Sequence, residues 1–240
     1  MAAVSTKAIV FNTIKYSDSS LIVKCYTLED GLKSYLVRGV LKSKKGRIKV
    51  GYFQPLTQLD IVANHIEKRS LHSIKEVHIA NPYKTIYKDI VKQSIVMFLA
   101  EVLTYSIKEE EPNKNLFSFL ETAFSWLDVH DKVSNFHLLF LLNLTQFLGF
   151  YPDLSEKDKF GFDLIEGNFT NNISQKNIIH KNDFHQFKKL LGINFDGIEN
   201  VSFSKQERQQ VLKIIVRYFE LHLDGFKTPK SLQILEAVFS

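Results

Sequence analysis

A run of cations is the part of this sequence with the clearest chemical meaning. Between positions 38 and 49, six basic side chains occur without one acid: Arg38, Lys42, Lys44, Lys45, Arg47 and Lys49. Such a cluster attracts phosphate oxygens or another anionic surface. A solvated loop that only keeps the protein soluble has the same composition. If all six cations neutralise phosphates, log affinity falls with log salt at a slope of roughly −5 on duplex DNA and about −4 on single strands.

The basic excess is confined to the first third of the chain. Residues 1–80 hold 13 Lys and Arg against 6 Asp and Glu, whereas the whole 240-residue chain has a net charge of +5. A hydrophobic fraction of 45% excludes wholesale disorder. The length allows one large domain or about two to three small ones.

Motifs for enzymatic chemistry are absent from the sequence. It contains no Gly-rich nucleotide loop, no paired His-Glu zinc motif and no nucleophile turn. Cys25 is the one cysteine, which excludes an internal disulfide and a thiolate zinc site; we interpret it as buried and inert. His65, His72 and His78 are not spaced to share a strand face, so we expect no metal site there. We therefore expect a protein that is not an enzyme.

Nothing in the sequence predicts contact with a membrane. No uninterrupted apolar run approaches the ~18 residues that a membrane helix needs. The first residues carry one Lys and lack the cleavage site of a secretory signal. Together with the single cysteine, these features predict a reduced, cytoplasmic compartment.

The first 80 residues have a sequence pattern that predicts a small β-barrel. Short runs rich in Val, Ile, Leu, Tyr and Thr predict strands over 8–14, 21–27, 34–41, 59–63 and 71–79. Asp30-Gly31 is a good hairpin turn, since Gly adopts a positive φ without strain. Five such strands fit an OB-fold, and an SH3-like barrel fits nearly as well. Tyr35, Tyr52 and Phe53 are candidates for stacking on bases, with packing in the barrel interior as the favoured alternative.

Residues 81–240 have a helical pattern of apolar residues, which begins after Asn81-Pro82. Apolar spacing predicts helices from about residue 87 to 102, over 115–127 and over 133–148, the last ended by Gly149. Residues 160–173 predict a hairpin, and 183–191 a short helix. Ser204 and Glu207 form a capping box that opens a further helix, and Thr228-Pro229 predicts the start of the last one. The fold class is therefore α+β: a barrel domain over 1–80 and a helical domain over 81–240.

Three stretches give the chain a resemblance to the RecO family of bacterial recombination mediators. The first runs from Tyr-Ser-Asp-Ser-Ser at 16–20 through the Asp30-Gly31 turn to Leu-Val-Arg-Gly-Val at 36–40. The second is Leu-Gly-Phe-Tyr-Pro-Asp-Leu at 148–154, and the third is Lys-Ser-Leu-Gln-Ile-Leu at 230–235. Their order and spacing are more specific than any one of them, and they extend along nearly the whole chain.

The resemblance implies a DNA-repair mediator without enzymatic activity. It implies an N-terminal OB-fold, binding of single- and double-stranded DNA, and annealing of complementary strands. The implied partners are RecR, the acidic C-terminal tail of single-stranded-DNA-binding protein and, indirectly, RecA. Many relatives hold zinc with two Cys pairs after the Pro of the second stretch. This sequence has no Cys there, so we expect no zinc, and the 160–173 hairpin should fold by packing alone.

By the same resemblance, the tail-binding site lies in the helical domain. The helix over 133–148 places Phe136, Leu139, Phe140 and Asn143 on one stripe, and this stripe together with Lys132 is the candidate site. Lys213 or Arg217 is an alternative source of the cation. The competing interpretation of the stripe is ordinary core packing.

Two other classes of function compete with a DNA-repair mediator. An OB-fold module that binds RNA or the ribosome would have the same barrel chemistry. A hydrolase or transferase with a dispersed site would instead show a cleft with convergent carboxylates or a metal.

Overall fold

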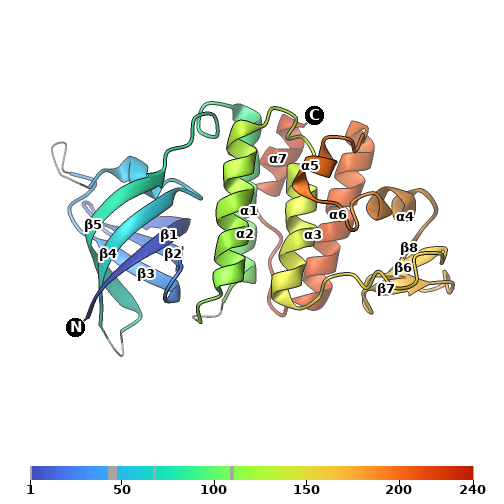
Figure 1. The fold of residues 1–240 in the computed structure, drawn as a ribbon, viewed down its shortest axis with the longest axis horizontal. Helices are drawn as coiled ribbons and strands as arrows, with labels where there is room; N and C mark the ends of the chain where they lie inside the picture. Colours follow the sequence, from blue (N-terminus) through green and yellow to red (C-terminus); the bar gives the residue numbers. More distant parts are fainter. Residues whose placement is uncertain (1, 43–47, 67–68, 109–110, 240) are drawn as a thin grey trace. The chain divides into compact units, whose positions relative to one another are not determined.

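The structure is a computed structural model that describes residues 2–42, 48–66, 69–108 and 111–239. The chain forms two compact units, Met1–Asp128 and Val129–Ser240. Figure 1 labels the elements of each unit. No helix in the described ranges is both long enough and apolar enough to cross a membrane.

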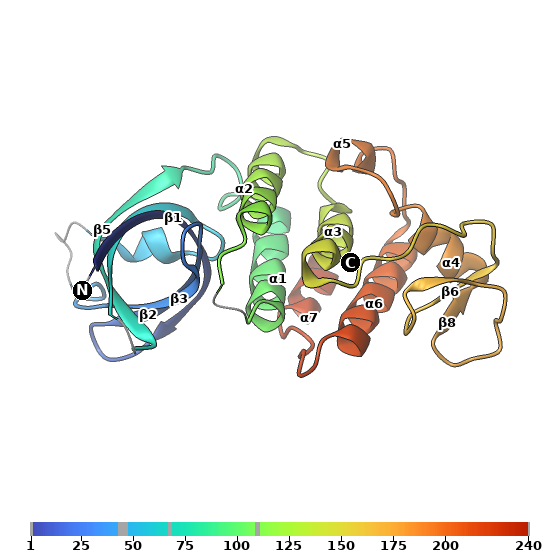
Figure 2. The same cartoon turned by 60° about the horizontal axis from the view of Figure 1, so that its bottom comes forward.

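A closed five-stranded barrel begins the first unit. Its strands are β1 (Ala2–Lys15), β2 (Leu21–Thr27), β3 (Gly31–Val37), β4 (Gln58–His65) and β5 (Leu71–Asn81), in the spatial order β1-β2-β3-β5-β4. Neighbouring strands are antiparallel except β3 and β5, which pair in parallel and close the barrel (Figure 2). This closure confirms the OB-fold, the five-stranded Greek-key barrel expected from the sequence.

Alternation along the strands fills the barrel interior. Val10, Val23, Cys25, Tyr35 and Ile61 are almost completely buried there. Burial raises the pKa of the Cys25 thiol to about 12, because the thiolate would lose its hydration. The interpretation of Cys25 as a buried, inert side chain is therefore confirmed. A short 3-10 helix, η1 (Val50–Phe53), adds Phe53 to the same core.

Two helices complete the first unit. α1 (Ile90–Ser106) begins after Asp89, whose carboxylate accepts hydrogen bonds from the backbone N–H groups of Val91 and Lys92. α2 spans Lys114–Val129. Both helices were predicted within a few residues of these bounds. The first compact unit thus extends beyond residue 80, where the sequence texture changes, as far as Asp128.

The second unit is mainly helical. Its helices are α3 (Phe136–Leu148), α4 (Lys181–Lys188), α5 (Phe195–Ile198), α6 (Lys205–His222) and α7 (Leu232–Val238). α3 ends at Gly149 with φ 83°, the left-handed conformation predicted for this glycine. The capping box of Ser204 and Glu207 is also present. The last helix begins at Leu232, later than Thr228-Pro229 suggested, and α5 was not predicted.

A small sheet lies in the same unit, in the region for which the sequence predicted a hairpin without zinc. β6 (Gly161–Asp163) and β7 (Asn168–Thr170) form the predicted hairpin, and β8 (Ile178–His180) adds an unpredicted third strand on the other side of β6. The Phe162 ring lies 5.5 Å from Phe169 and 5.1 Å from Phe187, centroid to centroid. Within the described ranges, no group of three His, Cys, Asp or Glu is arranged to hold a metal ion.

Candidate nucleic-acid interface

The seam between β3 and β5 opens into a groove on the barrel. The two strands pair at only two positions, Ser34 with Leu71 and Tyr35 with His72. Past these pairs lies a cavity of about 800 Å³. Its lining is mostly apolar, with two arginines and several small polar residues: Leu36, Val37, Arg38, Ile48, Ile66, Arg69, Ser70, Leu71, His72, Ser73 and Ile74.

A second cavity of about 470 Å³ adjoins the first and shares Arg69, Ser70 and His72 with it. Its other lining residues are Lys24, Leu32, Lys33, Ser34 and Lys108. No described lining residue of either cavity is Asp or Glu. We call the two cavities together the basic groove, defined by its cations Lys24, Lys33, Arg38, Arg69 and Lys108.

The cations of the basic groove come from four separate elements. Lys24 is on β2, Lys33 is on β3 and Arg38 directly follows it, Arg69 lies two residues before β5, and Lys108 follows α1. Burial lowers the pKa of Lys24, since a half-buried ammonium is less well hydrated than a free one. Like charges that share one surface repel one another, so an anion bound among them is stabilised by each. The arrangement suits a polyanion that follows the β3–β5 seam.

A polar cluster supports the groove from inside the barrel. The hydroxyl of Tyr35 and Nε2 of His65 are 3.1 Å apart, and Nδ1 of His65 is 3.5 Å from a carboxylate oxygen of Asp30. Nδ1 of His72 accepts a hydrogen bond from the backbone N–H of Ile66. The rings of His65 and His72 are 4.8 Å apart, because β4 and β5 are adjacent antiparallel strands. The sequence analysis considered only the spacing of these histidines along one strand, so it did not predict this contact between neighbouring strands.

The predicted DNA-binding residues divide into three groups. Arg38 lines the basic groove, as expected from its place after β3. Lys42 and Lys49 are exposed on the segment that follows. Lys44, Lys45 and Arg47 lie outside the described residues.

Sequence reasoning missed four cations of the basic groove. The hairpin register pairs Lys33 with Cys25 and Lys24 with Ser34, so strand alternation places the two lysines on opposite faces and does not predict that they line one cavity. No signal along the chain joins Arg69 and Lys108 either, because only tertiary folding brings them to the same cavity.

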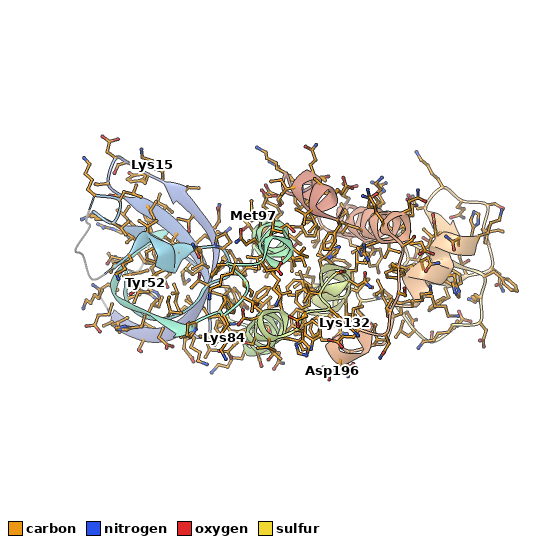
Figure 3. All side chains as sticks on the ribbon, turned by 90° about the horizontal axis from the view of Figure 1, so that it is seen from above. Lys15, Tyr52, Lys84, Met97, Lys132 and Asp196 are labelled. Atoms are coloured by element: carbon orange, nitrogen blue, oxygen red, sulfur yellow. The ribbon has the colours of Figure 1, made fainter. Side chains whose placement is uncertain are left out.

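The three aromatic side chains considered for base stacking belong to the barrel interior. Tyr35 and Phe53 are buried. Tyr52, labelled in Figure 3, is half-buried and packs against the same core. The favoured alternative, core packing, is confirmed for these residues.

The stripe predicted to bind an acidic tail is largely interior. Phe136, Leu139 and Phe140 are completely buried, and the Phe136 ring stacks on Phe195 at 5.1 Å between centroids. These three side chains are core residues, so the prediction that they form an open binding surface is corrected. Asn143 is half-buried, and Lys132 is exposed on the connection before α3 (Figure 3).

Comparison with known proteins gives matches along the whole chain. A family model described as "Recombination protein O N terminal" matches residues 1–83, and one described as "Recombination protein O C terminal" matches residues 87–232. A Flavobacterium psychrophilum protein named "DNA repair protein RecO" is 49% identical over 239 residues, covering 99% of both chains. Proteins of the same name from Flavobacterium johnsoniae and Bacteroides fragilis are 50% and 37% identical, and each alignment covers at least 98% of both chains.

Proposed function

The chain belongs to the RecO family of DNA repair proteins, and on that premise we propose that its barrel binds the backbone of single- and double-stranded DNA in the basic groove. The observation that carries this proposal is the cationic lining along the β3–β5 seam, in which none of the described residues is Asp or Glu. OB-folds bind oligonucleotides on a face formed by their second and third strands, and these two strands carry Lys24 and Lys33.

The groove suits recognition that is independent of sequence. Ammonium and guanidinium groups bind phosphates whatever the bases are, and the release of condensed counterions from the nucleic acid favours this binding. Arg38 and Arg69 present planar forks that can hold a phosphate with two hydrogen bonds, whereas the three lysines act as point charges. We expect the six-cation run of the sequence to contribute through Arg38, Lys42 and Lys49 at the end of the groove.

Strand annealing follows from this mode of binding. Two complementary strands repel each other through their phosphates, and a protein that neutralises those phosphates reduces the repulsion. Base edges stay free when the protein contacts only the backbone, so pairing can proceed. We propose that the chain acts in this way as a recombination mediator, with no catalytic step of its own.

The partners implied by the family are part of the same proposal. They are RecR, the acidic tail of single-stranded-DNA-binding protein and, indirectly, RecA. Of the residues predicted to bind the acidic tail, we retain Lys132 and Asn143, because solvent reaches both side chains. The buried phenylalanines of α3 support that surface from below and do not contact the tail.

Neutralising three cations of the basic groove tests the proposal. The triple variant Lys33→Gln, Arg69→Gln, Lys108→Gln should bind labelled oligonucleotides more weakly and anneal complementary strands more slowly. If each cation neutralises one phosphate, the slope of log affinity against log salt becomes shallower by about 3 on duplex and about 2 on single strands. Fluorescence anisotropy over about 50 to 200 mM salt measures the affinity and its salt slope.

A matched control separates the groove from net charge. Lys84→Gln, Lys88→Gln, Lys227→Gln removes the same number of charges from exposed positions that do not line the groove. This control should keep the wild-type slope within about one unit, the contribution of a single contact. Equal losses in the two triple variants would contradict a specific role for the groove.

A further inference from the structure

An exposed tyrosine stands at the end of the barrel near Arg38. Tyr16 follows β1 directly and is 61% exposed, and Ile14, two residues before it on the same face of the strand, is 52% exposed. In the part of the chain that the structure describes, no other aromatic ring stacks on Tyr16. One face of a phenol ring is therefore open to solvent on a domain that we propose binds nucleic acid.

Backbone hydrogen bonds hold the loop that carries this ring. The N–H groups of Tyr16 and Ser17 both donate to the carbonyl oxygen of Ser20, at 3.0 and 3.4 Å. The carbonyl oxygen of Ser19 accepts from the N–H of Leu41 at 3.0 Å, which ties the 16–20 loop to the turn after β3. Ser20 is itself buried, so the loop has a fixed base. A loop whose backbone is held in this way loses little backbone freedom when its side chains bind a ligand.

The charge around Tyr16 favours an anionic ligand. Lys15, labelled in Figure 3, is exposed and directly precedes Tyr16 in the chain, and the turn tied to the loop runs from Arg38 to Lys42. Asp18 is the one acid in residues 14–20 and 38–42. Arg38 also lines the basic groove, so the hydrogen bond from Leu41 to Ser19 makes the groove and the 16–20 loop neighbours.

We propose that Tyr16 is the base-stacking residue that makes the barrel prefer single strands to duplex. This inference rests on the proposed function, because it needs a nucleic-acid backbone held in the basic groove. A strand that leaves the groove past Arg38 brings an unpaired base to the 16–20 loop, where the phenol ring stacks on it. The stacking is independent of sequence because every base has a π-face, whereas duplex bases are already stacked on each other.

Replacement of Tyr16 tests the inference with two DNA substrates. Tyr16→Ala should weaken binding of single-stranded oligonucleotides roughly 5- to 150-fold, the range for one stacked base, and leave duplex affinity unchanged. Tyr16→Phe should retain wild-type binding, and Tyr16→Leu, which is apolar but not aromatic, should not. Ile79→Ala removes an exposed apolar side chain from another strand and serves as the control.

An oligonucleotide built of abasic sites identifies the contact. This oligonucleotide keeps the phosphates and lacks the bases. Wild-type protein should therefore bind it as weakly as the Tyr16→Ala variant binds the ordinary single strand. The Tyr16→Ala substitution should not weaken binding to the abasic oligonucleotide any further. The salt slope should be the same in wild-type and Tyr16→Ala proteins, because no phosphate contact is lost.

Two results would overturn the role of Tyr16. One is wild-type single-strand affinity in Tyr16→Ala. The other is an equal loss on single-stranded, duplex and abasic DNA, which would show that the side chain only shapes the loop. Failure of the underlying DNA-binding proposal would look different: groove-neutralised and wild-type proteins would then share one salt dependence, whatever residue stands at position 16.

Discussion

Asp128 is the side chain on which the junction between the barrel and its two following helices depends. Its carboxylate accepts hydrogen bonds from the backbone N–H groups of Lys84, Thr85 and Ile86, at 2.8, 2.8 and 3.0 Å. The ammonium of Lys92 is buried beside it and donates to the backbone carbonyl of Asp128 at 3.0 Å. The segment after β5 and the start of α1 are thus fixed to the end of α2.

The same contacts set the charge state of Asp128. Burial alone would raise the pKa of its carboxyl, but the three backbone N–H groups and the Thr85 hydroxyl outweigh burial and lower it. Because the pKa of this carboxyl is lower in the folded state than in the unfolded state, the carboxylate stabilises the fold fully at pH values above the unfolded-state pKa of about 4. That stabilisation is lost as the pH falls through the folded pKa.

Asp128→Asn should therefore destabilise the protein most at neutral pH. An Asn amide places donors against backbone N–H groups, and we expect a loss of roughly 2 to 4 kcal/mol in the free energy of unfolding. The difference between variant and wild type should shrink as the pH falls below the unfolded value of about 4 and through the lowered pKa of the folded state, where the wild-type carboxyl becomes protonated. Urea unfolding across this pH range measures it. Asp131→Asn, at an exposed site, is the control, and a pH-independent difference would contradict the electrostatic explanation.

Prediction from sequence at the scale of single residues succeeded where the signal was local. Cys25 and Gly149 were interpreted correctly, because strand alternation places the first inside and a helix end demands a left-handed residue at the second. Arg38 was found through the basic run. Arg69 and Lys108 could not be found, since nothing along the chain relates a residue shortly before β5 to a residue shortly after α1.

The three-stranded sheet β7-β6-β8 contains no cysteine, and aromatic side chains pack in its core. Phe162 is completely buried among Phe169, Phe187 and Tyr218. The adjacent Phe160 is 73% exposed. The two residues therefore form a matched pair for measuring what this packing contributes.

Phe162→Ala should lower the free energy of unfolding by about 3 to 5 kcal/mol, because it leaves a cavity in an aromatic core. Phe160→Ala should change it by less than about 0.5 kcal/mol, as surface substitutions do. Treatment of the wild-type protein with EDTA should leave the urea unfolding curve unchanged. A chelator-induced drop in the unfolding midpoint would contradict the prediction that the sheet folds without zinc.

The elements themselves were predictable to different degrees. The five barrel strands and the long helices carry clear periodicity over many residues, and the sequence located each of them. β8 and α5 span three and four residues, and the pairing of β8 with β6 depends on contacts far away in sequence. Segments this short carry too little local pattern to be recognised before the fold is known.

At the scale of the whole molecule, the basic excess and the barrel lie in the same part of the chain. The basic excess of residues 1–80 coincides with the barrel, and α1 contributes Lys108 to the same groove from just beyond its end. All the described residues that line the groove belong to the first unit, Met1–Asp128. We therefore propose that the first unit binds DNA and that the second recruits protein partners, a division that places the two activities on separately folded parts of the chain.

Lysine modification in the presence and absence of DNA tests this division most directly, because it uses the unaltered protein. A single-stranded oligonucleotide should protect Lys24, Lys33 and Lys108 from acetylation, as read by mass spectrometry, and leave the exposed Lys176, Lys213 and Lys227 of the second unit reactive. Protection confined to lysines of the second unit, with Lys24, Lys33 and Lys108 as reactive as in the free protein, would contradict the assignment of the DNA interface to the basic groove.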